Sequence, residues 1–281
     1  MNVNPFLDPD RQAELYGRAS RLARRSGALR RAKTGGRPVT ETVVELATTH
    51  RAEIPGPPDL VVDIGCGRGS SSRVLAERLT PTRLLGIDAA PALIAAARER
   101  VGHVPGVQAD FIRGDFHQLP LPKSSTALAV AAFCLYHSPG PHQAIAEIAR
   151  ILAPTGVAVL VTKALDSYSE LDALVASAGL DPRAEQHESL YVSAHGGNLA
   201  TLTKQAMEVV TVEHEEHRFT FDGHDHLAEY LATNPKYDFA PGLYGKSGAL
   251  AAVLHEWLPD RPVTTTSVVT YVVARPYGGR T

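Results

Sequence analysis

The chain has 281 residues, of which 44% are apolar and 21% are charged, and its net charge is -2. These values are typical of a globular protein and exclude a largely disordered chain, because the apolar content is high and the charge imbalance small. No stretch approaches the roughly 18 apolar residues that a membrane span requires. The first residues contain no apolar signal core, and two cysteines make no disulfide framework. We therefore expect a cytoplasmic protein with reduced thiols and no membrane partner.

Basic residues are concentrated at the start of the chain. Residues 1–40 contain nine arginine or lysine residues against three acidic residues. Apolar residues recur between the arginines at near-helical spacing, which favours a solvated amphipathic helix over a polyanion-binding arm. The sequence predicts one or two helices over 8–33, a break at 34–38 and a helix over 39–51. A proline-rich turn at 54–59 follows.

From residue 60 to residue 163 the pattern alternates between short apolar runs and helical stretches. Such alternation is typical of a parallel sheet with helices on both faces. The continuous apolar run over 126–135 is the type expected for a central parallel strand. We predict strands over 60–64, 83–88, 107–113, 126–135 and 157–162, and helices over 70–79, 91–101 and 142–152.

The remaining residues are less regular. Helices are predicted over 167–178, 199–206, 226–232 and 249–257, a long strand over 208–221 and a final strand over 264–274. The two late strands suggest an antiparallel hairpin at one edge of the sheet. The predicted fold is therefore α/β, with a doubly wound, mostly parallel seven-stranded sheet of the Rossmann-like type. One domain spans 1–281: a helical lid (1–53), a cofactor-binding core (55–163), a cap insertion after strand five (164–206) and the C-terminal part of the sheet (207–281).

The most informative segment is VVDIGCGRGS, residues 61–70, in which a buried strand runs into three glycines and a helix. Glycine permits close backbone approach to a ligand, and the helix N-terminus presents free N–H groups. The spacing is G-x-G-x-G rather than the G-x-G-x-x-G of dinucleotide-binding turns. Asp63, two residues before the first glycine, would repel a pyrophosphate and suits a ligand with an ammonium group.

Two further acids follow the next two predicted strands. Asp88 lies where an acid can accept hydrogen bonds from both ribose hydroxyls, and Asp115 follows the third strand. The carboxyl ends of parallel strands meet at one crevice, so we expect these acids to lie along it. The three acids suit a ligand that carries an ammonium group, a ribose and an amino-bearing base. S-adenosylmethionine is such a ligand.

Residues 60–163 resemble the core of class I S-adenosylmethionine-dependent methyltransferases. The segments that carry the resemblance are DIGCGRG, GIDAAP, GDFHQLP, TALAVAAFCLYH and AEIARILAPTGVAVLV. The resemblance implies that the methionine moiety lies near Asp63 and the first glycines, the ribose on Asp88 and the adenine amino group on Asp115. The full set of predicted cofactor-binding residues is Tyr16, Asp63, Gly65, Cys66, Gly67, Gly69, Asp88, Ala89, Asp115, Phe116, Ala132 and Phe133.

Candidate residues for the acceptor lie after the fourth predicted strand of the core and in the predicted lid and cap. His137 is a candidate general base, because its unperturbed pKa is near neutrality, and Tyr136 is a candidate for orienting the acceptor. Tyr16 on the N-terminal helix is expected to close over the cofactor. Candidate substrate residues in the lid and cap are Tyr168, Tyr191, His195, Tyr237 and Tyr244.

No metal is expected. Four histidines crowd into residues 213–226 (His214, His217, His224 and His226), but on a strand His214 and His217 point to opposite faces. The resemblance implies methyl transfer to a small molecule in bacterial specialised metabolism. Alternatives are methylation of RNA or protein, and other chemistry of the same cofactor, such as cyclisation or aminocarboxypropyl transfer. A nucleic-acid partner is not expected, and the sequence leaves a homodimer open.

Overall fold

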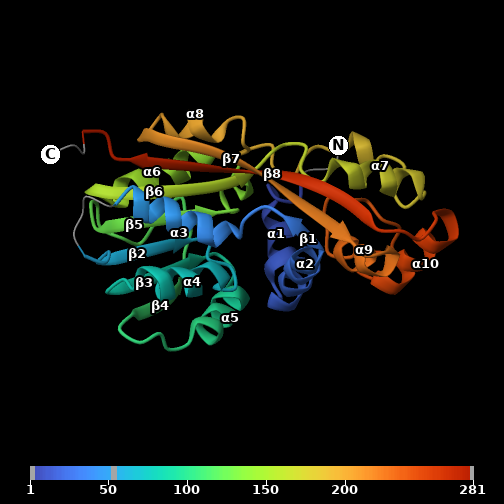
Figure 1. Cartoon of the computed structure of the whole chain (residues 1–281), viewed down its shortest axis with the longest axis horizontal. Helices are drawn as coiled ribbons and strands as arrows, with labels where there is room; N and C mark the ends of the chain where they lie inside the picture. The colour runs from blue at the N-terminus through green and yellow to red at the C-terminus, as the bar shows by residue number, and fades with distance from the viewer. Residues whose placement is uncertain (1–3, 52–55, 279–281) are drawn as a thin grey trace. The chain divides into compact units, whose positions relative to one another are not determined.

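The computed structural model describes residues 4–51 and 56–278 (Figure 1). Residues 54 and 55 of the predicted turn at 54–59 lie outside the described residues. The helices are α1 (Pro9–Tyr16), α2 (Ala19–Ala32), α3 (Val39–Thr49), α4 (Ser70–Leu79), α5 (Pro91–Val101), α6 (Pro141–Ile151), α7 (Ser169–Ser177), α8 (Leu199–Thr203), α9 (His224–Leu231) and α10 (Ser247–Trp257). No helix in the described ranges is long and apolar enough to cross a membrane.

The described strands form one mixed sheet in the order β1-β7-β8-β6-β5-β2-β3-β4. The five strands from β2 to β6 pair in parallel, whereas β8 pairs antiparallel with β6 and β1 antiparallel with β7. The α/β fold with a mostly parallel sheet is thus confirmed. The bounds are β1 (Lys33–Gly35), β2 (Leu60–Ile64), β3 (Arg83–Asp88), β4 (Gln108–Arg113), β5 (Thr126–Ala132), β6 (Leu152–Lys163), β7 (Glu208–Phe221) and β8 (Val263–Arg275).

The sheet has eight strands rather than the predicted seven. The additional strand, β1, lies at the predicted break after the N-terminal helices and pairs Lys33 with Phe219. Three residues are too few to show a strand period, so this pairing has no signature in the sequence. β7 and β8 are neighbours in the sheet and run in opposite directions, as the predicted edge hairpin requires (Figure 1).

The chain divides into two compact units, which we call the core unit and the accessory unit. The core unit comprises Arg37–Lys163, Ser193–His214 and Val269–Thr281. The accessory unit comprises Met1–Gly36, Ala164–Val192 and Glu215–Val268. The long strands β7 and β8 contribute residues to both units. The predicted roles of 1–53 as a lid and of 164–206 as a cap stay predictions.

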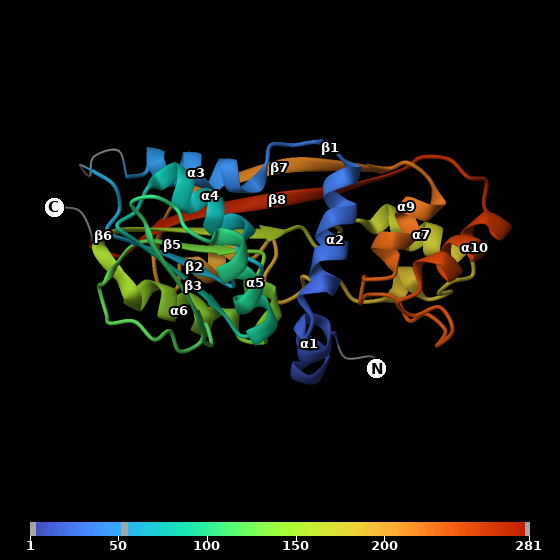
Figure 2. The ribbon, with the colours of Figure 1, turned by 90° about the horizontal axis from the view of Figure 1, so that it is seen from below.

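The parallel strands of the core unit are covered on both faces. Alternate residues of the strands, such as Val157, Val159 and Val161, pack in one apolar cluster with residues of α3, α4 and α5. α6 packs against β6 and α8, and Figure 2 shows α3 and α6 on opposite sides of the strands. All five residues of β2 are buried, which explains why the central strands read as continuous apolar runs.

The central strand β5 is shorter than predicted. It ends at Ala132, whereas the apolar run continues to Leu135. Phe133 takes a left-handed conformation with φ of 59°, and a 3₁₀ turn follows over Leu135–His137. The run stays apolar because Cys134, Leu135 and Tyr136 are all buried, so hydrophobicity alone does not mark the end of the strand.

Candidate functional site

The glycine-rich turn joins β2 to α4 in the core unit, as the sequence predicts. The N–H groups of Gly65 and Cys66 both donate to the Ile87 carbonyl, at 2.8 and 3.1 Å, which ties the turn to the end of β3. Gly65 has φ of +65°, and a Cβ atom there would lie 2.4 Å from the Cβ of Cys134. The turn therefore packs so closely against the residues after β5 that no Cβ atom fits, which requires glycine at this position.

Asp63 is buried beneath the turn, with 1% of its surface exposed. The Ser72 hydroxyl, on α4, donates to its carboxylate at 2.5 Å. Burial raises the pKa of Asp63 to about 7; the Ser72 hydrogen bond opposes this shift and the charge of Asp88 adds to it. A buried carboxylate with a neighbouring carboxylate is an environment that a cationic group stabilises.

Asp88 ends β3 and holds the turn from the other side. Its carboxylate accepts hydrogen bonds from the Gly67 N–H and the Ala90 N–H, each at 2.9 Å. Burial raises the pKa of Asp88 despite these two bonds. Each carboxylate oxygen keeps a further lone pair, so Asp88 can still accept from two ribose hydroxyls. Ala89 follows it as an exposed residue.

Asp115 follows β4, beside the end of β3, where Asp88 pairs with Arg113. Its side chain is 68% exposed, and its Oδ1 atom lies 2.8 Å from Nδ1 of His117. Nε2 of His117 in turn lies 2.7 Å from the hydroxyl of the buried Ser138. This chain connects the segment after β4 to the segment after β5. The sequence indicates no role for His117 or Ser138, because nothing in GDFHQLP points to a partner 21 residues away.

The predicted acceptor side of the site lies at the end of β5. Phe133 and Ala132 are partly exposed there, and the Lys163 ammonium group lies 5.2 Å from the centre of the Phe133 ring. Tyr136 is buried, and its ring centre lies 4.8 Å from that of His137. A non-glycine residue with positive φ is a strained conformation of the kind that clusters at functional sites, which draws attention to Phe133.

Both cysteines of the chain lie in the same region as free, buried thiols. Cys134 donates to the Ile64 carbonyl at 3.3 Å, and burial raises the pKa of both Cys66 and Cys134. A thiol with a raised pKa stays protonated at neutral pH and is a poor nucleophile. Cysteine catalysis therefore has no support here.

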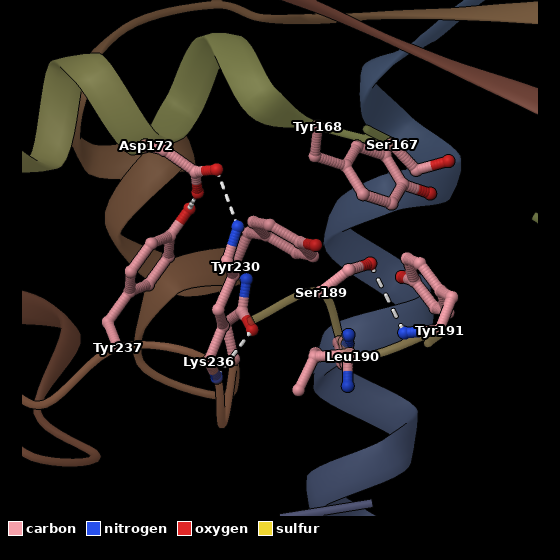
Figure 3. A pocket seen from close by; sticks show the side chains of 11 residues that line it. Ser167, Tyr168, Asp172, Ser189, Leu190, Tyr191, Tyr230, Lys236 and Tyr237 are labelled. Carbon is pink, nitrogen blue, oxygen red and sulfur yellow. Dashed lines mark hydrogen bonds and ion pairs between the residues drawn. The ribbon is translucent and has the colours of Figure 1, made fainter. Parts of the chain in front are cut away.

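The predicted lid and substrate residues are distributed over both units. His195 belongs to the core unit, where burial lowers its pKa. Tyr16 is the last residue of α1 in the accessory unit, and Tyr244 of the same unit accepts a hydrogen bond from Arg21 at 3.0 Å. Tyr168, Tyr191 and Tyr237 line one small pocket of the accessory unit (Figure 3).

This pocket combines aromatic rings with charged groups. Asp172 accepts from the Tyr237 hydroxyl at 2.9 Å and from the Lys236 ammonium group at 2.5 Å (Figure 3). Burial raises the pKa of Tyr168 to about 12, so its hydroxyl stays protonated. The sequence indicates Tyr168, Tyr191 and Tyr237 as candidates, but neither Tyr230 nor the polar residues of the pocket. The other lining residues are Arg25, Ser167, Ser189, Leu190, Tyr230 and Asn234.

The fold and the acid–glycine turn define a class of protein. Residues 61–156 match a family model described as a methyltransferase domain. The chain therefore carries a class I S-adenosylmethionine-dependent methyltransferase domain, which confirms the resemblance seen in the sequence, and S-adenosylmethionine is the cofactor of this class.

Particular relatives narrow this class only in part. Trans-aconitate 2-methyltransferase of Acidovorax sp. (strain JS42) is 37% identical over 131 residues, which make up 46% of this chain and 47% of the relative. The chain spans about half the length of the curated relatives it matches.

Solved structures share the fold at low sequence identity. A candidate methyltransferase of Bacillus halodurans C-125 aligns with a TM-score of 0.57 at 15% identity, over 83% of this chain and 98% of that one. The [4+2]-cyclase SpnF aligns with a TM-score of 0.51 at 19% identity, over 84% of this chain and 80% of that one. These likenesses show the fold alone, and a fold does not fix the reaction.

Proposed function

We propose that this protein transfers the methyl group of S-adenosylmethionine to a small-molecule acceptor, in bacterial specialised metabolism. The observation that carries the proposal is the pair of carboxylates, the buried Asp63 and the partly buried Asp88, around the glycine turn of a methyltransferase domain. A relative that acts on a small acid, trans-aconitate 2-methyltransferase, supports a small acceptor over RNA or protein. A homodimer stays a prediction.

The residues of the core unit fit the chemistry of this cofactor. Two neighbouring carboxylates, of which Asp88 raises the pKa of Asp63, supply negative charge where the cofactor carries an ammonium group. Because Asp63 is buried, we propose that it stabilises the ammonium group of the cofactor through its charge. Asp88 is assigned to the ribose hydroxyls. Asp115 and Phe116 are assigned to the adenine, with His117 as the residue that holds the Asp115 carboxylate. Gly65, Cys66, Gly67, Gly69 and Ala89 complete the proposed backbone cradle.

When bound, the sulfonium supplies an activated methyl group, and the chain's own residues need only align the acceptor, exclude water and accept a proton. The Nδ1 atom of His137 lies 3.1 Å from the Cys134 carbonyl oxygen. In the neutral tautomer that donates to this carbonyl, Nδ1 carries the hydrogen and Nε2 is the basic nitrogen, which is the arrangement that a general base requires. We therefore propose His137 as the general base and Tyr136 as the residue that orients the acceptor.

Tyr168, Tyr191 and Tyr237, which line the pocket of the accessory unit, stay predicted substrate residues. Aromatic walls with a few polar groups are typical of small-molecule sites. Tyr168 and Tyr237 line it, together with the cationic groups of Arg25 and Lys236. His195 and Tyr244 lie outside the pocket and remain predicted substrate residues.

Product analysis tests the proposal. The protein is incubated with S-adenosylmethionine alone and with panels of small carboxylic acids, phenols and amines, and the products are identified by mass spectrometry. We expect S-adenosylhomocysteine, together with a methylated acceptor, only in reactions that contain a small molecule. Asp88→Ala should lose this activity, whereas Asp110→Ala, on the exposed part of β4, should keep it.

Three outcomes would contradict the proposal. Methylthioadenosine formed from the cofactor alone would show attack on the aminocarboxypropyl arm. S-adenosylhomocysteine formed only in the presence of RNA or protein would show that the acceptor is a macromolecule and not a small molecule. Conversion of a small molecule without consumption of the cofactor would indicate the kind of chemistry that the cyclase of the same fold represents.

A further inference from the structure

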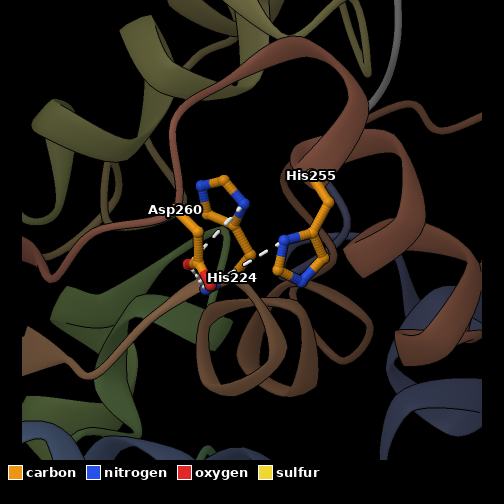
Figure 4. Close-up of side chains that lie close together, drawn as sticks. All are labelled: His224, His255 and Asp260. Atoms are coloured by element: carbon orange, nitrogen blue, oxygen red, sulfur yellow. Dashed lines mark hydrogen bonds and ion pairs between the residues drawn. The ribbon is translucent and has the colours of Figure 1, made fainter.

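Two imidazoles and a carboxylate converge in the accessory unit, away from the pocket. His224 begins α9, His255 lies in the last turn of α10, and Asp260 lies in the loop before β8 (Figure 4). One ligand atom from each of the three lies within 4.8 Å of the others. Nδ1 of His224 is 3.8 Å from Oδ1 of Asp260, and Nδ1 of His255 is 3.8 Å from Oδ2 of Asp260.

His224 is the buried member of this cluster. Its side chain is 1% exposed, and its Nδ1 atom has no hydrogen-bond partner among the described residues. A separation of 3.8 Å from Asp260 is too long for a hydrogen bond. A buried polar nitrogen without a partner costs about 1–3 kcal/mol, so a group that fills the space beside it is expected to stabilise the fold.

The carboxylate of Asp260 is fixed between the two imidazoles. Its Oδ1 atom accepts a hydrogen bond from the backbone N–H of His224 at 2.9 Å. The side chains of His255 and Asp260 are 41% and 51% exposed, so both can move by the small amount that a closer contact requires. A fourth residue, Asp225, lies behind His255: its Oδ2 atom is 3.9 Å from Nε2 of His255.

We propose that His224, His255 and Asp260 bind a Zn²⁺ ion. Two imidazoles and a carboxylate, with a water in the fourth position, form an established zinc-ligand set, with bonds of about 2.0–2.2 Å. Tetrahedral ligands at that distance are about 3.4 Å apart, so the two 3.8 Å separations close by a few tenths of an ångström on binding. Asp225 then faces the second nitrogen of a metal-bound histidine, as carboxylates next to zinc sites commonly do.

The other histidines of residues 213–226 do not join this site. Nδ1 of His214 lies 2.9 Å from the Thr270 hydroxyl, and Nε2 of His226 lies 3.0 Å from the Ala28 carbonyl oxygen. His214 is exposed and His217 is buried, on opposite faces of β7 as predicted. The sequence does not reveal the cluster, because His255 and Asp260 lie 31 and 36 residues after His224. The proposed ion joins the start of α9 to the end of α10, two helices that pack together.

Titration with Zn²⁺ alone tests this proposal, with no cofactor or acceptor present. Competition against a chromophoric chelator should give one tight site per chain, and Co²⁺ should give the visible absorption of a tetrahedral site. His255→Ala should weaken zinc binding by more than tenfold, and Asp225→Asn by about 10- to 100-fold. His103→Ala, an exposed histidine of the core unit, is the matched control and should bind as the wild type does.

Thermal melting supplies the second readout. Zn²⁺ should raise the melting temperature of the wild type and of His103→Ala but not that of His255→Ala. Because the His255 side chain is 41% exposed, its replacement should change the metal-free melting temperature little. Absence of zinc binding by the wild type, or equal binding by His255→Ala and the wild type, would overturn the proposal. Neither result bears on methyl transfer, since activity is not measured.

Discussion

The core unit and the accessory unit concentrate their polar chemistry in different ways. In the core unit, Asp63, Gly65 and Asp88 come from two neighbouring strand ends and lie within 26 residues of sequence. In the accessory unit, the pocket joins residues from three segments, such as Arg25, Asp172 and Tyr237. The first arrangement is a local motif that a sequence can display. The second exists only after long-range folding, so its function must be read from the structure.

The largest expected effect is on the reaction of the core unit. Replacing His137 with Asn removes the proposed general base and should lower kcat by about 10²- to 10⁴-fold for an acceptor that must lose a proton. The dissociation constant of S-adenosylmethionine should stay within twofold, because His137 does not hold the cofactor. Steady-state kinetics and calorimetry measure the two quantities.

His142→Asn is the matched control for this variant, since His142 is exposed at the start of α6. It should keep full activity. If His137→Asn is as active as the wild type, the core unit uses no base at this position. Its reaction then depends only on the alignment of the acceptor with the methyl group.

The second prediction concerns the stability of the accessory unit. Asp172 and Lys236 are 11% and 16% exposed and form an ion pair between α7 and the segment after α9. Asp172→Ala leaves the Lys236 charge without this partner and should lower the free energy of unfolding by about 3–5 kcal/mol. Urea unfolding followed by circular dichroism measures the loss.

Tyr237→Phe removes only one hydrogen bond to the same carboxylate and should cost about 1 kcal/mol. Equal losses for the two variants would mean that the accessory unit does not depend on its ion pair. In that case the long-range ion pair of the accessory unit would contribute no measurable stability.

The third prediction tests how tightly the core turn is packed. Gly65→Ala places a Cβ atom 2.4 Å from that of Cys134 and also strains a positive φ, so it should cost about 2–5 kcal/mol. Gly106→Ala has the same φ strain, at +78°, but meets no atom within 4 Å. It should cost about 1–2 kcal/mol in the same unfolding assay. If Gly65→Ala is as stable as Gly106→Ala, the backbone at Gly65 does not pack against Cys134 as closely as the structure indicates.

The fourth prediction is a pH dependence of cofactor binding. Without ligand, Asp63 has a pKa of about 7, so it is mostly protonated below that pH. A cationic ligand requires the ionised form; binding therefore strengthens as pH rises, by up to about tenfold per unit below pH 7, and levels off above it. Calorimetry between pH 5.5 and 7.5 measures the slope and the proton released.

Asp63→Asn should bind with little dependence on pH in this range, and the exposed Asp110→Asn should behave as the wild type does. If the affinity of Asp63→Asn for the cofactor still depends on pH, the proton released on binding comes from another group.

Local patterns were sufficient to predict most of the core unit. The apolar run before Gly65 and the acids after successive runs place the site at the strand ends, since parallel strands order those ends in space. The end of β5 was not predictable, because Phe133 leaves the strand through its backbone conformation while its neighbours remain apolar.

Long-range contacts account for the features that the sequence did not reveal. β1 depends on pairing with β7, the His117–Ser138 bond spans 21 residues, and the proposed zinc ligands come from three elements. Each residue taken alone has ordinary neighbours in sequence. Only the folded chain brings these groups close together.

The central claim is that the core unit binds S-adenosylmethionine through the acids of its glycine turn. Isothermal titration of the cofactor into the wild type, Asp88→Ala, Asp88→Asn and Asp110→Ala tests this claim most directly. We predict binding at least about tenfold weaker for Asp88→Ala, because two ribose hydrogen bonds are lost, an intermediate loss for Asp88→Asn, and no change for Asp110→Ala. A wild type that does not bind the cofactor, or an Asp88→Ala variant with an unchanged dissociation constant, would contradict it.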